Sequence, residues 1–221
     1  LFVLAAPLLA TSVSGVVFQL TDLKFISDIG EEAVTAVVVT NQSFRQIVMI
    51  LLMGASFGAQ GMIARLVGEG RGEEADHAAG QIVFAGAVIS LGVAVAGLTF
   101  GPEMLAVMNL APHVQELALP YLRLAFLMSF GWIFVTLFGA ILNGAGDSTT
   151  PMIITIIHTA VSLTTEFVLV YGYTAFPAFR VESIAFGQAA GQVVGVAISL
   201  AVLFSGSSRV HVLARHLKPA L

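Results

Sequence analysis

The sequence predicts an all-α integral membrane protein built as a bundle of six transmembrane helices. Hydrophobic residues make up 57% of its 221 positions and charged residues only 10%, whereas a soluble domain carries about 25% charged residues. The mean hydropathy is +0.96. Apolar runs recur at the length of about 20 residues that a helix needs to cross the bilayer core. No ten-residue alternation of apolar and polar residues recurs, as a membrane β-barrel would require.

Loops rich in glycine, proline and charge divide the chain into six apolar segments. The predicted spans are 1–25, 33–64, 77–100, 117–142, 151–172 and 183–205. Four of them contain a charge-free run of membrane length; the second is interrupted by Arg45 and the fifth by Glu166. The second span is long enough to protrude or bend. Residues 206–221 are predicted to be a cytoplasmic tail or the start of a link to a second lobe.

The distribution of basic residues predicts the orientation of the bundle, since Lys and Arg in short loops favour the cytoplasmic side. One side of the predicted topology carries Arg65, Arg71, Arg209, Arg215 and Lys218, and the other only Lys24 and Arg180. We therefore expect both termini on the cytoplasmic side of a bacterial or archaeal plasma membrane. Because Leu1 opens directly on an apolar stretch, we expect a truncated first helix rather than a signal peptide.

Composition also excludes several classes of function. The chain has no cysteine and a formal net charge of −4. Disulfides, thiolate metal sites and cysteine nucleophiles are therefore excluded, and a nucleic-acid footprint would need clustered Lys and Arg. The sequence has no Gly-x-x-x-x-Gly-Lys-Ser/Thr loop for ATP. We expect no enzymatic activity and no cofactor beyond H⁺ or Na⁺ as a coupling ion.

Ionisable and amide groups inside the predicted spans mark the candidate site, because such groups are costly in lipid and are by default functional or paired. The first and fifth spans run outward and carry Asp22 and Glu166 near their outward ends, and the sixth runs inward with Gln188 near its start. Ser162 precedes Glu166 by four residues, on the same helix face. We predict that these four side chains bind a proton or Na⁺, the alternative being that Asp22 is a hydrated structural residue.

Further polar residues are candidates to line the same cavity: Gln19, Asn41, Arg45 and His158. Gln19 precedes Asp22 by three residues and is expected to share its helix face. Arg45 has three interpretations: an ion pair with Asp22 or Glu166, a cavity-lining cation, or a side chain that reaches to the interface. His158 is either a packing histidine or a proton relay.

Small residues at helical spacing predict close helix contacts in the membrane. Gly187, Gly191 and Gly195 repeat every four residues along the sixth span, and Gly54 with Gly58 forms a shorter pair in the second. We expect both sets to pack helices rather than to bind a substrate.

Several motifs, in order along the chain, resemble one transporter family. They include Val17–Gly30 with Asp22, Gly54–Gly70 followed by Arg71-Gly-Glu-Glu, Pro120-Tyr-Leu-Arg123, Gly144-Ala-Gly-Asp147-Ser-Thr-Thr-Pro151-Met, and Glu166–Gly172. These segments resemble the multidrug and toxic compound extrusion (MATE) family of the MOP superfamily. The Gly-Ala-Gly-Asp…Thr-Pro loop is the most specific of them.

The resemblance implies one six-helix lobe, the N-terminal one, of a twelve-helix transporter whose two lobes are related by an axis along the membrane normal. It implies efflux of cationic or amphipathic drug-like compounds driven by H⁺ or Na⁺. Asp22 matches the family's acidic residue in the first span. The family's Asn and Asp in the fifth span fall on Ser162 and Glu166, and its Thr in the sixth span falls on Gln188.

Three alternatives stay open at this point. A lipid-linked-sugar flippase of the same superfamily would line its cavity with several cations, and this lobe offers only Arg45 centrally. A half-size protein would act as a homodimer, because an even number of spans inserts both copies in the same orientation. An intramembrane serine protease would use the Gly54-Ala-Ser56-Phe-Gly58 string with His158 as base, although a nucleophile elbow needs a strand-to-helix turn.

Overall fold

The computed structural model describes residues 2–40, 46–108, 110–172 and 182–205, and this part of the chain is helical apart from short connections. Seven helices follow one another: α1 (Phe2–Ile29), α2 (Glu31–Thr40), α3 (Gln46–Gly68), α4 (Gly72–Val107), α5 (Pro112–Gly144), α6 (Thr149–Tyr171) and α7 (Glu182–Ser205). All except α2 contain a segment long and apolar enough to cross a membrane. The predicted all-α bundle of six membrane-length helices is therefore confirmed.

The second predicted span, 33–64, corresponds to two helices. The ten-residue α2 is too short to cross the bilayer, and α3 is the spanning helix. Gly30 separates α1 from α2 at a φ of 140°, a conformation that favours glycine, and Glu31 and Glu32 then lie in the first turn of α2, where the helix dipole favours acidic side chains. Asn41 and Arg45 lie outside the described residues.

The other helices extend beyond the predicted spans. α4 has 36 residues and α5 has 33, against the roughly 20 needed to cross the hydrocarbon core. Their additional turns carry Glu73, Glu74, Glu103 and Glu116. Charged residues end the apolar pattern on which the prediction depended, but they do not end the helix, because its backbone hydrogen bonds form within the helix itself.

The Gly-Ala-Gly-Asp loop between α5 and α6 caps the start of α6. Gly146 adopts a φ of 86°. The Oδ1 atom of Asp147 accepts hydrogen bonds from the backbone N–H groups of Thr149 and Thr150, both at 3.0 Å. The Thr150 hydroxyl donates to Asp147 Oδ2 at 2.6 Å. One carboxylate thus satisfies two of the N–H groups that a helix leaves unpaired at its N-terminus.

The turn between α3 and α4 is held by a small charge network. Glu69 accepts hydrogen bonds from Arg65 at 2.8 Å and from Arg71 at 2.7 Å. These two cations, Arg65 first, hold the pKa of the Glu69 carboxyl below its ordinary value. Gly70, at a φ of 74°, completes the reversal.

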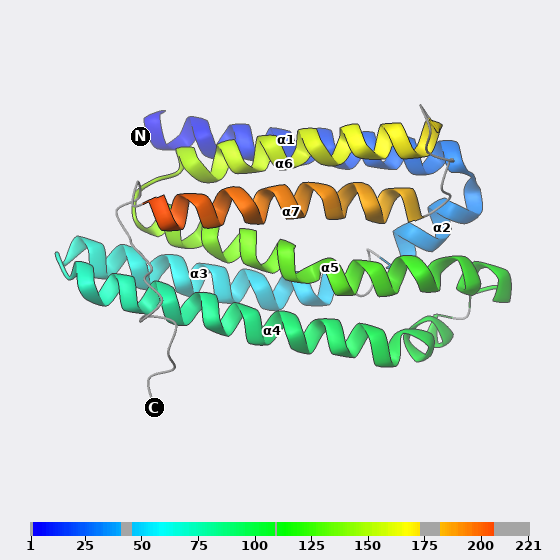
Figure 1. Cartoon of the computed structure of the whole chain (residues 1–221), viewed down its shortest axis with the longest axis horizontal. Coiled ribbons are helices and arrows are strands. Elements are labelled where there is room, and N and C mark those ends of the chain that lie inside the picture. The colour runs from blue at the N-terminus through cyan, green and yellow to red at the C-terminus, as the bar shows by residue number, and fades with distance from the viewer. Residues whose placement is uncertain (1, 41–45, 109, 173–181, 206–221) are drawn as a thin grey trace.

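The helices form two groups joined through α5 and α7 (Figure 1). α1 lies along α6, and α6 lies along α7, while α3 and α4 pack on α5. The α3–α4 turn and the α5–α6 loop lie at the same end of the bundle as the start of α1, and the α4–α5 connection and α2 lie at the opposite end (Figure 1). We call these the inner end and the outer end, after the predicted orientation.

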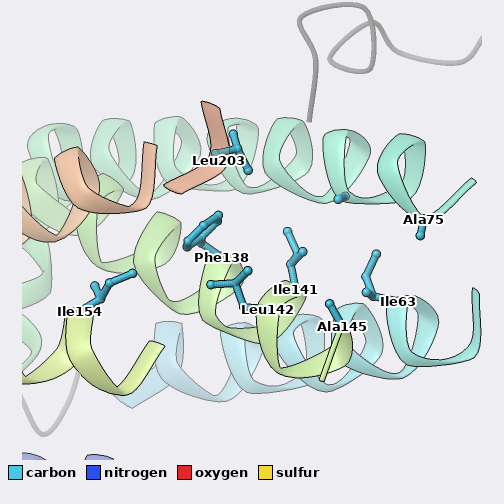
Figure 2. Packing of buried hydrophobic residues seen from close by; sticks show 9 residues of the cluster. Ile63, Ala75, Phe138, Ile141, Leu142, Ala145, Ile154 and Leu203 are labelled. Atoms are coloured by element: carbon cyan, nitrogen blue, oxygen red, sulfur yellow. The ribbon is translucent and has the colours of Figure 1, made fainter. Parts of the chain in front are cut away.

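A cluster of buried apolar residues holds the inner end together. Phe138, Ile141 and Leu142 of α5 contact residues of the four helices around them, which are Ile63, Ala75, Ala79, Ile154 and Leu203 (Figure 2). Many large apolar side chains point outward instead, as those of Leu20, Leu51 and Leu91 do. Since lipid is as apolar as these side chains, the bundle depends on close packing rather than on exclusion of water.

Candidate functional site: a buried carboxylate pair beside an inner cavity

The two acidic residues predicted to form the site are both buried. The side chain of Asp22 on α1 is 8% exposed and that of Glu166 on α6 is 0% exposed. The two carboxyl groups lie close enough to interact electrostatically. α1 and α6 run side by side along their length, which brings together two residues 144 positions apart in the sequence.

A stripe of small residues on α7 makes room for the polar face of α6. A Cβ atom built at Gly187 would overlap the Glu166 side chain, and one built at Gly191 would overlap the Ser162 hydroxyl. A Cβ at Gly195 would lie 3.8 Å from the His158 ring. His158, Ser162 and Glu166 are four residues apart, so they share one face of α6, and the glycines meet them in antiparallel order.

This register gives the glycines a specific role. Any larger residue at position 187 or 191 would displace the polar side chain opposite it, so the stripe both packs α7 on α6 and leaves room for Glu166 and Ser162 between the helices.

Gly54 and Gly58 of α3 lack such a close contact with the other described residues. In the described part of the chain nothing lies within 4 Å of a Cβ built at either, so the helix contact predicted at these two glycines is not formed there.

Apolar side chains cover the outer side of the carboxylate pair. Phe25 and Ile26 follow Asp22 by about one turn of α1, and Ile184 precedes Gly187 by about one turn of α7. They belong to one buried cluster with Tyr121 and Val37. This cluster lies between the carboxylate pair and the outer end.

The remaining predicted ligands divide between two places. Ser162 is fully buried between Glu166 and His158 on α6. Gln188 is also buried, and it follows Gly187 directly on α7. It lines a small cavity of about 50 Å³, together with Phe126 and Ser129 of α5. Consecutive residues point about 100° apart on a helix, so Gln188 lies on a different face of α7 from the residue that contacts Glu166.

Gln19 is exposed in the described part of the chain although Asp22 is buried, and its predicted place in the cavity stays a prediction. Three residues turn a helix through about 300°, which leaves Gln19 about 60° from the direction of Asp22. On α1, which packs on α6 along one side only, that difference moves a side chain from the interface to the surface. The two other predicted cavity residues, Asn41 and Arg45, lie outside the described residues.

A larger cavity of about 390 Å³ lies toward the inner end, between α1 and α6 on one side and α3 and α5 on the other. Polar residues contribute much of its lining, including Ser56, Gln60, Asn143, Thr155, His158 and Gln192. We call it the inner cavity. Its volume is in the range of about 300–1,000 Å³ typical of small-molecule sites. No Asp, Glu, Lys or Arg is among the described residues that line it.

His158 lies at the deep end of the inner cavity, with the Phe18 ring 6.3 Å away on α1. One turn further along α6, Ser162 separates it from Glu166. The structure thus places the predicted cavity residue His158 in the inner cavity, on the same face of α6 as Glu166 and about two turns from it. Both the packing and the relay interpretation of His158 fit this position.

The nucleophile elbow considered for a serine protease is absent. Gly54, Ser56 and Gly58 lie within the continuous helix α3, whereas an elbow needs a strained strand-to-helix turn. Ser56 and His158 both line the inner cavity, but the Ser56 hydroxyl has no hydrogen-bond partner among the described residues. The arrangement therefore lacks the contact between nucleophile and base that acyl transfer needs.

The amide residues that line the inner cavity were not predicted from the sequence: Gln60, Asn143 and Gln192. Gln192 had a signal, because it lies four residues after Gln188 and alternates with the glycine stripe along α7. Asn143 lies at the C-terminal end of α5, where polar residues are ordinarily solvated, whereas Gln60 lies about two turns before the end of α3. No spacing in the sequence connects these two residues.

The carboxylate pair has the chemistry of a monovalent-cation site. Two ionised carboxylates repel each other strongly when shielded from water, and a bound proton or Na⁺ removes part of that repulsion. Among the described residues no group of three or more His, Cys, Asp and Glu side chains gathers as a metal cluster would.

The chain is similar to known proteins over most of its length. Residues 7–168 match the family model MatE. The "Probable multidrug resistance protein NorM" of Thermotoga maritima is 30% identical over 203 residues, which are 91% of this chain and 43% of that protein. The chain therefore spans less than half the length of this curated relative.

Solved structures show the same fold. A multidrug resistance MATE family transporter of the MOP superfamily in an outward-facing conformation gives a TM-score of 0.88 at 21% identity, covering 98% of this chain and 47% of that one. A transporter of the same description in an inward-facing conformation gives a TM-score of 0.81 at 21% identity, covering 92% and 45%.

Proposed function

This chain belongs to the MatE family, and we propose that it forms the N-terminal lobe of an efflux antiporter that exports cationic or amphipathic compounds in exchange for H⁺ or Na⁺. The observation that carries the proposal is the buried pair of Asp22 and Glu166 on adjacent helices. Buried ionisable groups within spans are costly, and transporters use them as ion sites. The lobe would complete a transporter with a second lobe of six helices.

Coupling follows from the charge of the pair. With both carboxylates ionised, repulsion between them favours a conformation in which α1 and α6 separate or water enters. With a proton or Na⁺ bound, the closely packed arrangement is favoured. An ion shifts a conformational equilibrium only by its difference in affinity for the two states. Export then requires the drug-like compound to prefer the state that the ion disfavours, with the two lobes alternating access around a central cavity.

The orientation remains part of the proposal. Both chain ends face the cytoplasm of a plasma membrane, with the Arg65–Arg71 turn on the same side, as the distribution of Lys and Arg favours. The carboxylate pair then lies in the outer half of the bundle and the inner cavity in the inner half. The uncharged lining of that cavity, in the described residues, gives no support to a flippase for anionic lipid-linked sugars.

Neutralising substitutions test the carboxylate pair. Asp22→Asn and Glu166→Gln keep the size of each side chain and remove its charge. Each variant is reconstituted in liposomes as the full-length parent protein. We expect its ion-driven ethidium efflux to fall at least about tenfold, which corresponds to a loss of about 1.4 kcal/mol in the free energy that couples the ion to transport.

Asp28→Asn is the matched control. Asp28 lies on the same helix as Asp22, but it is paired with Lys24 and accepts a hydrogen bond from the Tyr171 hydroxyl at 2.6 Å, outside the buried pair. We expect its efflux to stay close to wild type. Unchanged ion-driven efflux in both Asp22→Asn and Glu166→Gln would sink the proposal.

A further inference from the structure

The inner cavity ends close to the carboxylate pair. Pro151 and Asn143 border it at the inner end of α5 and α6, and His158 borders it deeper in the bundle. Pro151 and His158 are about 10 Å apart along the axis of α6. Ser162 and Glu166 follow on the same helix face, so the cavity stops about two helical turns, or about 12 Å, from Glu166.

Polar atoms in the cavity wall need partners that the described part of the protein does not supply. Ser56 Oγ, Asn143 Oδ1 and Gln192 Oε1 are buried without a hydrogen-bond partner among the described residues. They come from three different helices, α3, α5 and α7, and all three residues line this one cavity. Buried polar groups in native proteins are nearly always paired, often with water. A cavity of about 390 Å³ has room for roughly ten waters at about 30 Å³ each.

The two sides of the carboxylate pair are unequal. Toward the outer end the pair meets the apolar cluster of Phe25, Ile26 and Ile184. Toward the inner end the next polar side chain on the same face of α6 is Ser162, whose buried hydroxyl has no hydrogen-bond partner among the described residues, and His158 and the inner cavity follow. A hydroxyl can both donate and accept a hydrogen bond, so Ser162 extends the polar face of α6 toward the pair, whereas apolar side chains cover the opposite side.

We propose that the inner cavity is a water-filled vestibule, through which the coupling ion passes between the Asp22–Glu166 pair and the inner aqueous phase, with Ser162 as the last polar group before the pair. That the ion is the coupling ion rests on the proposed function. The presence of water in the cavity can be tested without any transport. For a proton, Ser162 Oγ accepts one proton and passes its own to the next acceptor. For Na⁺, α6 and α7 must separate, because Gly191 closes directly on the Ser162 hydroxyl.

Gln192 and Trp132 divide this vestibule from the smaller cavity that Gln188 lines. Both residues border both cavities. Gln192 is 9% exposed and lies against Gly131, where an added Cβ would come within 2.9 Å of the Gln192 Cβ. The Gln192 side chain therefore lies between the vestibule and the smaller cavity.

Cysteine accessibility tests the vestibule directly, since this chain has no cysteine of its own. In the full-length parent protein, with any cysteine of the second lobe changed to serine, Thr155→Cys places a thiol on the cavity wall. Ile156→Cys is the matched control, because it lies at the same depth on α6 with its side chain 45% exposed on the outside of the lobe. Glu69→Cys, on the α3–α4 turn, reports which face of the membrane is the inner one.

The charged, membrane-impermeant reagent methanethiosulfonate ethylsulfonate is added to the face on which Glu69→Cys reacts. Only a hydrated thiol ionises to the reactive thiolate. We expect Thr155→Cys to react at least about tenfold faster than Ile156→Cys. A tenfold difference in rate corresponds to about a tenfold difference in the fraction of thiol that is ionised. Equal or slower reaction at position 155 would show a dry cavity and overturn the inference.

Thr155→Cys also tests whether the coupling ion passes through the inner cavity. We expect reagent attached at position 155 to slow ion-driven ethidium efflux several-fold and dithiothreitol to restore it, with no effect at position 156. A rapid reaction at position 155 that leaves efflux unchanged would overturn the assignment of the inner cavity as the route of the ion. If the parent protein exports nothing under either gradient, the proposed function fails, and thiol reactivity alone decides whether the hydrated vestibule exists.

Discussion

At the scale of single residues, the sequence located the acids of the site but not its complete surroundings. Asp22, Ser162 and Glu166 were predictable because a polar residue inside an apolar span is conspicuous and its depth follows from the topology. For Gln19 and Gln188 the topology indicates the depth in the membrane but not the direction of the side chain, because one position along a helix turns a side chain by about 100° and three positions leave it about 60° away. Only the packing of α1 and α7 on α6 determines which directions are buried.

The carboxylate of Asp147 gives a residue-scale prediction about stability. Asp147→Ala removes the acceptor of both N-terminal hydrogen bonds of α6 and should cost about 1 kcal/mol, as loss of an N-terminal cap usually does. Asp147→Asn keeps a side-chain oxygen and should cost less. Thermal unfolding of the detergent-solubilised parent protein measures both. Equal melting temperatures for Asp147→Ala and the wild type would show that the loop does not cap α6.

At the scale of helices, the existence and order of the six spans followed from composition, whereas their ends did not. The apolar pattern stops where the hydrocarbon stops, but α4 and α5 continue past it because the backbone hydrogen bonds of a helix need no membrane. The length of 33–64 indicated that this span protrudes or bends, but hydropathy did not divide it into two helices, since α2 and α3 are both apolar. The glycine stripe on α7 was visible as a spacing, but its polar partners on α6 were not.

The α6–α7 register gives an element-scale prediction. Gly187→Ala places a methyl group where the Glu166 side chain lies, and overpacking of this kind costs about 1–3 kcal/mol. We expect a lower melting temperature and impaired ion-driven efflux.

Gly92→Ala is the matched control, because it lies within α4 and a Cβ there meets nothing within 4 Å in the described part of the chain. Its melting temperature should stay unchanged or rise, since alanine is about 0.5–1 kcal/mol better than glycine inside a helix. Equal stability of Gly187→Ala and Gly92→Ala would contradict the register.

At the scale of the whole molecule, the described helices form a lobe with two chemically different ends. The inner end has a polar cavity beside a buried apolar cluster of α3–α7, and the outer end has the apolar cover over the carboxylate pair. The fold was predictable because lipid permits few architectures, and the motif order indicated the family. The inner cavity was not predictable, because its walls come from five helices and no local pattern shows their relative rotation.

Orientation gives a prediction at this scale. Single cysteines at Glu69, in the α3–α4 turn, and at Pro112, at the start of α5, lie at opposite ends of the bundle. In intact cells, we expect a membrane-impermeant thiol reagent to label Pro112→Cys and to leave Glu69→Cys unlabelled until the cells are opened. The reverse pattern would place the termini outside and invert the assignment of the inner cavity.

The most direct test of the central claim is ethidium efflux from proteoliposomes that contain the full-length parent protein, with pH and Na⁺ gradients imposed one at a time. The account predicts efflux that follows one inward ion gradient, stops when that gradient is collapsed, and is lost in the Asp22→Asn, Glu166→Gln double variant. Efflux that proceeds equally in the double variant, or that responds to neither gradient, would contradict the account, because the buried carboxylate pair would then have no part in coupling.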